Sequence, residues 1–524
     1  MSLTQRIFRI SLLSAAAAAF LFWICHHAEV SIAEGLRSIR VAQTSDGVNY
    51  AGSLLQSIDH PLHPLAIAAA QRLLGGAGPY VWQTAAQCAS VIALVLAVLP
   101  IYLLGRDLFE DDTTGLLGCI LFFNNPIVGL IAVNVLSETT FLLFWTWGSW
   151  TSVRFLREGR FNWLPWAIGF GALAYLTRPE GLLLHLALVT TLILLPLHRL
   201  TRINWPRWRA AVALLVLGPA VLVGPYMAYK GGVGTRPAVA RVIGTLPQST
   251  PEALEREQPF PTGQTVLQTY AIAIVQVFKA LSRAVTWPLI PLSVIGLMAM
   301  PPSEGRSRVW LFQAVIISLS SIALVRLHAT GGYCTNRHAL VPALIFTLAA
   351  AHGLAWLMRS VVVDAKKLGL GEGRLRPGPA VWALLLATAI AWPLSRSMTP
   401  YNSGFAPYRM AGWWIAHQPD SNKRVLDLTD WSLFFSDTPG YGISKADEVS
   451  QMTGIRYLVL NETQLKSTGH LGALARNLVA NRDPVARFPE HLLPNQLQVI
   501  VYDLSAGEHE PASLAVENRD SAVR

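Results

Sequence analysis

Residues 79–104 read PYVWQTAAQCASVIALVLAVLPIYLL, an apolar stretch without a single charged side chain. As one helix, this stretch is long enough to cross the ~30 Å hydrocarbon layer of a bilayer. The rest of the chain has the same character, because 52% of its 524 residues are hydrophobic and only 14% are charged. Soluble domains carry about 25% charged residues. The composition therefore indicates an integral membrane protein.

Similar apolar stretches recur up to residue 395, separated by short polar connectors. The sequence predicts an all-α polytopic membrane module, residues 1–395, with about 11 transmembrane helices. The predicted spans lie near 8–27, 79–104, 115–133, 139–157, 163–177, 180–197, 210–228, 285–300, 309–326, 339–358 and 379–395.

The tail, residues 396–524, has a different pattern. Segments 424–428, 455–460 and 497–504 have strand character, and 463–482 has helical periodicity. We therefore expect a small soluble α/β domain after the last span.

Basic residues predict the orientation in the membrane. Arg6 and Arg9, together with the basic segments 154–160, 198–209, 304–308 and 359–376, fall on one side of the predicted spans. Positive loops favour the cytoplasm, which predicts a cytoplasmic N-terminus in a plasma (inner) membrane. With 11 spans the C-terminal domain is extracytoplasmic, whereas an even number would place it inside. The net charge of +10 then reflects topology rather than nucleic-acid binding.

The predicted outward loops are 28–78 and 229–284, and the first contains SDGVNYAGSLLQSIDHPLHP (45–64). Asp46 precedes a helical apolar stripe, so it suits an N-cap, a general base, or both. His60 and His63 suit phosphate contact, metal binding or a solvated loop. Tyr50 is a further candidate in the same segment.

More charged residues stand at the predicted outward ends of later spans. Glu138 opens a span behind Ser137, where the helix dipole alone favours a carboxylate. Arg178 precedes Pro179 and Glu180, and an ion pair with Glu180 or another carboxylate is the structural alternative to phosphate binding. Arg337 and His338 follow a glycine pair, which suits oxyanion binding. An acid opposite cationic groups is what glycosyl transfer from a lipid-linked sugar phosphate requires.

The order of SDGVNYAG, HPLHPL, LSETTFLLF, LTRPEGLLL and GGYCTNRHALVPAL resembles the membrane-embedded GT-C glycosyltransferases. The resemblance is to the family 39 and aminoarabinose-transferase type, which includes the protein O-mannosyltransferases. It implies a polyprenyl-phosphate sugar donor and an inverting reaction at the outer membrane face. By resemblance, Asp46 is the catalytic base, Glu138 a second acid, and Arg178 and Arg337 donor-phosphate ligands.

Some alternatives stay open on the sequence alone. A transporter or lipid flippase predicts charges deep within spans, and a non-catalytic assembly subunit predicts that the tail carries the function. The acceptor is a lipid, glycan or protein, and the sugar is undefined. No metal-ligand spacing and no nucleic-acid motif is present, but a divalent metal remains possible. NET at 461–463 matches the glycosylation sequon.

Overall fold

The computed structural model divides into two compact units, Met1–Ala77 with Val81–Tyr401 and Gly78–Tyr80 with Asn402–Arg524. The two units are described separately below. The residues described are 2–29, 33–45, 49–197, 205–232, 239–240, 242, 265–300, 304–332, 334–367, 379–419, 423–442, 454–467, 470–489 and 497–505.

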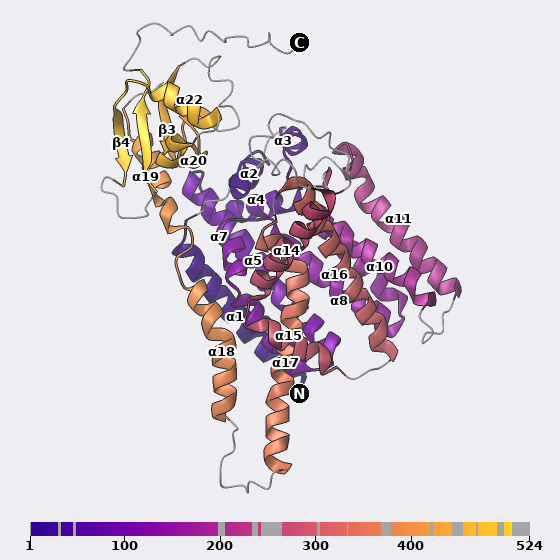
Figure 1. The fold of residues 1–524 in the computed structure, drawn as a ribbon. Helices are drawn as coiled ribbons and strands as arrows, with labels where there is room; N and C mark the ends of the chain where they lie inside the picture. The colour runs from indigo at the N-terminus through magenta and orange to yellow at the C-terminus, as the bar shows by residue number, and fades with distance from the viewer. Residues whose placement is uncertain are drawn as a thin grey trace. The chain divides into compact units, whose positions relative to one another are not determined.

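The first unit is helical (Figure 1). Its described helices are α1 (Leu3–His26), α2 (Ala33–Gln43), α3 (Tyr50–Gln56), α4 (Leu62–Leu74), α5 (Pro79–Phe109), α6 (Asp112–Phe123), α7 (Pro126–Val133), α8 (Glu138–Glu158), η1 (Phe161–Trp163), α9 (Leu164–Tyr175), η2 (Pro179–Gly181), α10 (Leu182–Leu194), η3 (Leu195–Leu197), α11 (Trp205–Tyr229), α14 (Val266–Val285), α15 (Leu289–Met298), α16 (Glu304–Gly331), η5 (Asn336–Ala339), α17 (Leu340–Lys367) and α18 (Pro379–Ser397).

Each predicted span coincides with one or two of these helices, so the predicted helical membrane architecture is confirmed. Five helical segments of the described chain are long and apolar enough to cross a membrane singly, and up to seven if each bent pair counts as one span. The predicted number of about 11 stays a prediction.

One predicted span, 115–133, is not straight, and a second bend lies where the predicted span 285–300 begins. The range 115–133 breaks between α6 and α7 with a 56° bend, and α14 meets α15 at 92°. At the first break, the Asn125 side chain caps α7 by accepting a hydrogen bond from the Ile127 N–H. Its amide nitrogen donates to the Ala284 carbonyl near the end of α14, over 2.6 Å. The two bends are thus joined by one hydrogen bond.

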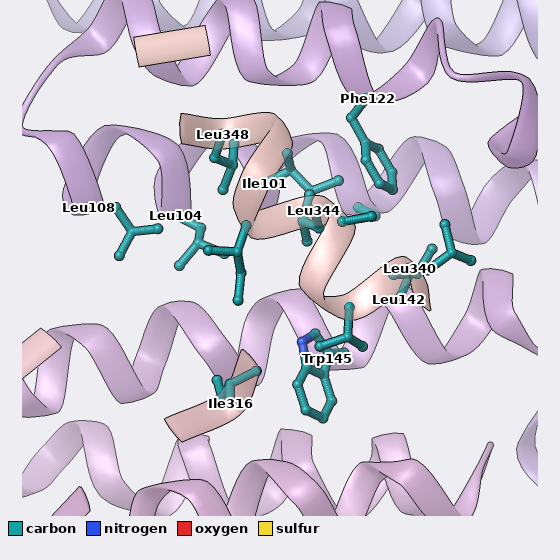
Figure 2. Close-up of a cluster of buried hydrophobic side chains, with 14 of the residues drawn as sticks. Ile101, Leu104, Leu108, Phe122, Leu142, Trp145, Ile316, Leu340, Leu344 and Leu348 are labelled. Carbon is teal, nitrogen blue, oxygen red and sulfur yellow. The ribbon is translucent and has the colours of Figure 1, made fainter. Parts of the chain in front are cut away.

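The core of the first unit lies between α5, α6, α8, α16 and α17. Figure 2 shows apolar side chains from these five helices meeting, each no more than 3% exposed. Because lipid is as apolar as these side chains, close packing rather than exclusion from water holds such helices together. The labelled residues are Ile101, Leu104, Leu108, Phe122, Leu142, Trp145, Ile316, Leu340, Leu344 and Leu348.

One end of this bundle collects Arg6 and three of the basic segments that the sequence placed on one side, 154–160, 304–308 and the start of 359–376. The acidic turn Glu110–Asp112 between α5 and α6 receives arginines from four other helices. The pairs are Arg6–Asp112 at 2.9 Å, Arg157–Glu110 at 2.8 Å, Arg306–Glu110 at 2.6 Å and Arg359–Asp111 at 3.2 Å. These arginines therefore lie at the same end of the helices, here called the basic end.

The second unit contains a five-stranded sheet in the order β2-β1-β3-β5-β4. The strands β1, β2 and β3 are parallel, whereas β5 is antiparallel to both β3 and β4. Its elements are η6 (Ser403–Phe405), α19 (Ala406–Ala416), β1 (Arg424–Asp427), α20 (Trp431–Ser436), β2 (Gly440–Gly442), β3 (Ile455–Asn461), α21 (Glu462–Lys466), α22 (His470–Val479), β4 (Pro484–Phe488) and β5 (Val499–Asp503).

This unit confirms the α/β class that the sequence predicts for the tail. The three predicted strands correspond to β1, β3 and β5. The predicted helix 463–482 is divided into α21 and α22, and the short strands β2 and β4 were not predicted. Gly78 and the first two residues of α5, Pro79 and Tyr80, belong to this unit, and the rings of Tyr80 and Phe435 lie 5.6 Å apart.

Candidate functional site

A second group of charged residues lies at the opposite end of α8 from the basic end. Glu138 begins α8 and Glu158 ends it, so the two ends are ~30 Å apart at 1.5 Å per residue. Around Glu138 the structure gathers Glu34 from α2, Arg178 and Glu180 from the α9–α10 connection, and Arg337 from η5. These five residues are called the charged cluster.

Arg178 and Glu138 form the buried centre of the charged cluster. An Arg178 Nη1 lies 2.8 Å from Glu138 Oε2, and the two side chains are only 6% and 4% exposed. Arg178 also donates from Nη2 and Nε to the two oxygens of Glu180, at 2.8 and 3.3 Å, and from Nη1 to Ser137 Oγ at 3.3 Å. The ion pair considered for Arg178 from the sequence is therefore present, with two carboxylates instead of one.

Arg337 approaches the same carboxylate from the other direction. Its Nη1 lies 3.8 Å from Glu138 Oε1 and donates a short hydrogen bond to Glu34. Neither oxygen of Glu138 accepts a hydrogen bond of good geometry from the described residues. The Glu138 carboxylate is therefore held between two guanidinium groups mainly by charge. Ser137, the residue before α8, makes no side-chain cap and accepts a hydrogen bond from Arg178.

Close backbone contacts fix the elements that carry these residues. A Cβ added to Gly181 would lie 2.1 Å from the Tyr175 backbone nitrogen, so only glycine permits the tight α9–α10 turn behind Arg178. A Cβ added to Gly35 would lie 2.1 Å from the Asn134 carbonyl, so α2 rests directly on the turn before Glu138. In that turn Val135 has φ +55, a strained conformation for a β-branched residue.

Beside the charged cluster, a separate ion pair and a lysine hold the segment 54–59 in place. Arg37 of α2 binds both oxygens of the buried Asp59, at 2.9 and 3.0 Å. Lys230, just after α11, donates to the carbonyls of Leu54 and Ser57. Burial lowers the pKa of Lys230 below its usual value, and the nearby Asp59 carboxylate opposes this shift.

The two histidines of the first loop are both buried. His63 lies between Thr140 Oγ1 and the Val135 carbonyl, each at 3.0 Å. Because a carbonyl only accepts, Nε2 donates to Val135, whereas Nδ1 can accept from the Thr140 hydroxyl when the ring is neutral or donate to it when the ring is charged. Burial lowers the pKa of His63, which favours the neutral ring. His63 thus supports the strained turn before Glu138, a structural role beyond the three uses considered from the sequence.

The remaining predicted residues are distributed around this region. His60 packs edge-on against Tyr175, with ring centroids 5.1 Å apart, and Tyr50 donates to the Pro61 carbonyl over 3.3 Å. The His338 ring accepts from Thr335 in a capping box that begins η5, the element carrying Arg337. Asp46 lies outside the described residues, and α3 begins four positions later, at Tyr50.

Sequence reasoning missed Glu34, Arg37 and Lys230. Glu34 and Arg37 occupy an ordinary amphipathic helix, and their partners lie elsewhere in the chain, so no local signal identified them. Among the described residues no group of three metal-ligating side chains is close enough to hold an ion. The sequon residue Asn461 caps α21 through Gln464 and donates to Tyr408 over 2.9 Å.

Comparison with known proteins adds to this description. Residues 59–222 match the model of the dolichyl-phosphate-mannose-protein mannosyltransferase family, a range that includes Glu138, Arg178 and Glu180. No curated protein matches the chain.

Several solved structures have the same fold. An oligosaccharyltransferase from Archaeoglobus fulgidus, in its apo form, superposes with a TM-score of 0.58 at 12% identity, covering 91% of this chain and 72% of the other. ArnT from Cupriavidus metallidurans bound to undecaprenyl phosphate gives 0.56 at 12% identity, covering 96% and 99%. The mycobacterial arabinofuranosyltransferase AftD gives 0.52 at 14% identity, covering 95% and 42%.

These similarities confirm the predicted resemblance: the chain has the fold of the GT-C membrane glycosyltransferases, with an α/β unit at its C-terminus. The matching structures are polytopic membrane proteins, which agrees with the apolar helices of the first unit.

Proposed function

We propose that the chain is an inverting glycosyltransferase that moves a sugar from a polyprenyl-phosphate donor to an acceptor at the outer face of the plasma (inner) membrane. One observation carries the proposal: two arginines from distant parts of the chain meet at one buried carboxylate. A carboxylate and a phosphate offer similar oxygen acceptors to a guanidinium group, so this arrangement also suits the phosphate of a lipid-linked sugar.

The arginines act on the leaving group. As the glycosidic C–O bond breaks, its electron pair passes to the donor phosphate, and negative charge grows on the phosphate oxygens. Arg178 and Arg337 both lie against the buried Glu138 carboxylate before the reaction begins, so they require little reorganisation to stabilise this charge. His338, which caps the helix carrying Arg337, positions that arginine.

We assign the base role to Asp46 and a supporting role to Glu138. Glu138 is enclosed by two guanidinium groups, which suits holding the arginines rather than removing a proton. Asp46 would accept the proton of the acceptor nucleophile as that nucleophile attacks the anomeric carbon opposite the phosphate. The new bond forms as the bond to phosphate breaks, so the sugar configuration is inverted.

The orientation follows from the two charged ends. The basic end, with Arg6 and the 154–160, 304–308 and 359 segments, is assigned to the cytoplasm by the positive-inside tendency. The charged cluster then faces outward. We assign residues 1–395 to the catalytic membrane module and 396–524 to an extracytoplasmic domain.

A transfer assay with purified full-length protein and radiolabelled polyprenyl-phosphate sugars tests the proposal. We expect wild-type protein to transfer label, and Asp46→Asn to reduce the rate by roughly 10²–10⁴-fold, as for loss of a general base. Glu462→Gln serves as control, because its carboxylate pairs with the exposed Lys466 of the second unit and does not belong to the charged cluster. Equal rates for Asp46→Asn and wild type would exclude Asp46 as the base.

A further inference from the structure

Glu34 occupies a position on Arg337 that a donor phosphate would need. It comes from the first turn of α2 and bonds Arg337, 303 residues away, at the exposed side of the charged cluster. We propose that Glu34 holds Arg337 in the donor-free protein and leaves it when the donor phosphate binds. The inference rests on the proposed function and adds an exchange of anions to it.

Charge counting is the first argument. The charged cluster contains three carboxylates, Glu34, Glu138 and Glu180, and two guanidinium groups, so its formal charge is −1. A sugar phosphodiester carries one negative charge, and adding it would give −2 in a largely buried site. Like charges at short distance in low dielectric are strongly unfavourable. Exchange of one carboxylate for the phosphate keeps the total unchanged.

Burial identifies the carboxylate that leaves. The Glu138 side chain is 4% exposed and lies between both arginines, so its removal would break the centre of the cluster. Glu180 is 39% exposed, but it is two residues from Arg178 and binds it through two hydrogen bonds. Glu34 is 32% exposed and is attached through a separate helix. The departure of Glu34 toward solvent therefore leaves the Arg178–Glu138 and Arg178–Glu180 pairs in place.

The same exchange serves product release. After transfer, the polyprenyl phosphate must leave two arginines that bind it strongly. A carboxylate held on α2 beside Arg337 competes for that arginine, because the Gly35–Asn134 contact keeps the first turn of α2 close to it. Glu34 thus lowers the affinity for phosphate and limits product inhibition.

The test measures binding of undecaprenyl phosphate to the purified full-length protein. We expect Glu34→Gln to bind about five- to tenfold more tightly than wild type, a change on the order of one partly exposed ion pair. General structural damage lowers affinity, so a gain is specific to removal of a competitor. Glu158→Gln, which loses an ion pair with Arg154 at the basic end, is the matched control and should bind like wild type.

A double-mutant cycle links the effect to Arg337. In an Arg337→Ala background, adding Glu34→Gln should change the affinity less than about twofold, because the competed group is absent. Equal or weaker binding by Glu34→Gln than by wild type, with Glu34→Ala in agreement, would overturn the exchange and leave the proposed function intact. Failure of every protein to bind undecaprenyl phosphate would overturn the proposed function itself.

Discussion

Glu138 is the least exposed carboxylate of the charged cluster, and this decides how its removal should act. Exposed ion pairs contribute about 0–1 kcal/mol, whereas breaking a buried pair and leaving a charge unpaired costs about 3–5 kcal/mol. After loss of Glu138, Arg178 keeps Glu180 and Arg337 keeps Glu34. The loss of stability caused by removing Glu138 should therefore fall between these two values.

We predict that Glu138→Gln lowers the free energy of unfolding by about 1–3 kcal/mol, the range for losing a buried interaction of a charged group. Unfolding in mixed detergent micelles would measure it. The matched Glu462→Gln, at an exposed pair, should change stability by under about 0.5 kcal/mol. If both variants changed the free energy of unfolding by a similarly small amount, the Glu138 carboxylate would not stabilise the fold through its buried ion pairs.

Asp427 provides a second residue-scale prediction, in the second unit. It is the fully buried last residue of β1 and accepts hydrogen bonds from the Thr429 and Leu433 N–H groups, yet burial raises its pKa to about 6. An acid whose pKa is higher in the folded state binds protons on folding. The free energy of unfolding is therefore higher at low pH. It decreases by up to about 3 kcal/mol as the pH rises from about 4 to 6.

Hydrogen exchange of β1 and α20 amides in the full-length protein would follow this loss, after correction for intrinsic exchange rates. Asp427→Asn has no titrating group there, so its stability should be flatter across this interval. Stability that increases between pH 4 and 6 in wild type, relative to Asp427→Asn, would contradict the raised pKa.

Single residues were predictable where charge interrupts apolar sequence. Glu138, Arg178 and Arg337 stand at the ends of apolar stretches, and the structure brings the three together. Glu34 was not predictable, because nothing near it in the sequence points to a partner 303 residues away. The local sequence pattern identifies charged residues that are costly to bury. It does not identify the residues with which they pair in the folded chain.

At the scale of elements, the α9–α10 connection decides where Arg178 points. Arg178 has extended backbone and is followed by the single turn of η2, which Gly181 closes against the end of α9. Any side chain at 181 must push η2 away from Tyr175. Arg178 and Glu180 would move with it.

We predict that Gly181→Ala reduces transfer activity at least about tenfold, since small misplacements of positioning groups cost up to about 10²-fold. Gly169→Ala, in the neighbouring α9, is the control, because an added Cβ there meets nothing within 4 Å. The initial rate of the transfer assay gives the comparison. Equal activity of both variants would show that the turn tolerates displacement.

Elements were predicted well in position and less well in shape. Hydropathy places helices wherever apolar residues persist, and these helices are present. It does not show the bend within 115–133, because Asn124 and Asn125 are too few polar residues to interrupt an apolar average. The strands β2 and β4 escaped detection because β2 contains two glycines and β4 begins at Pro484, and both residue types are uncommon in strands.

For the whole molecule, the two charged ends of the helical unit predict its direction across the membrane. The basic end contains ion pairs from four helices, and the charged cluster lies at the far end of α8. The charges of these two groups thus lie at the ends of the helices and not midway along them. A transporter is expected to have charges deep within its spans, so these two groups do not support a transporter function.

Cysteine labelling tests this direction. A single cysteine replacing Arg160, which is 72% exposed at the basic end, should react with impermeant reagent only from the cytoplasmic side. One replacing the exposed Thr463 of the second unit should react only from outside. The native thiols Cys88 and Cys334 are partly exposed and must be replaced first. Labelling of both positions from one side would refute the assigned topology.

The bond between Asn125 and Ala284 has a consequence for biogenesis. The helices α6 and α7 enter the membrane when the ribosome has not yet made the carbonyl that receives the Asn125 amide, which lies 159 residues later. A polar group without a partner in hydrocarbon costs several kcal/mol, so the early intermediate must hold water or another helix at this bend. Nascent chains arrested before residue 284 should therefore be retained by the insertion machinery longer than those carrying Asn125→Leu.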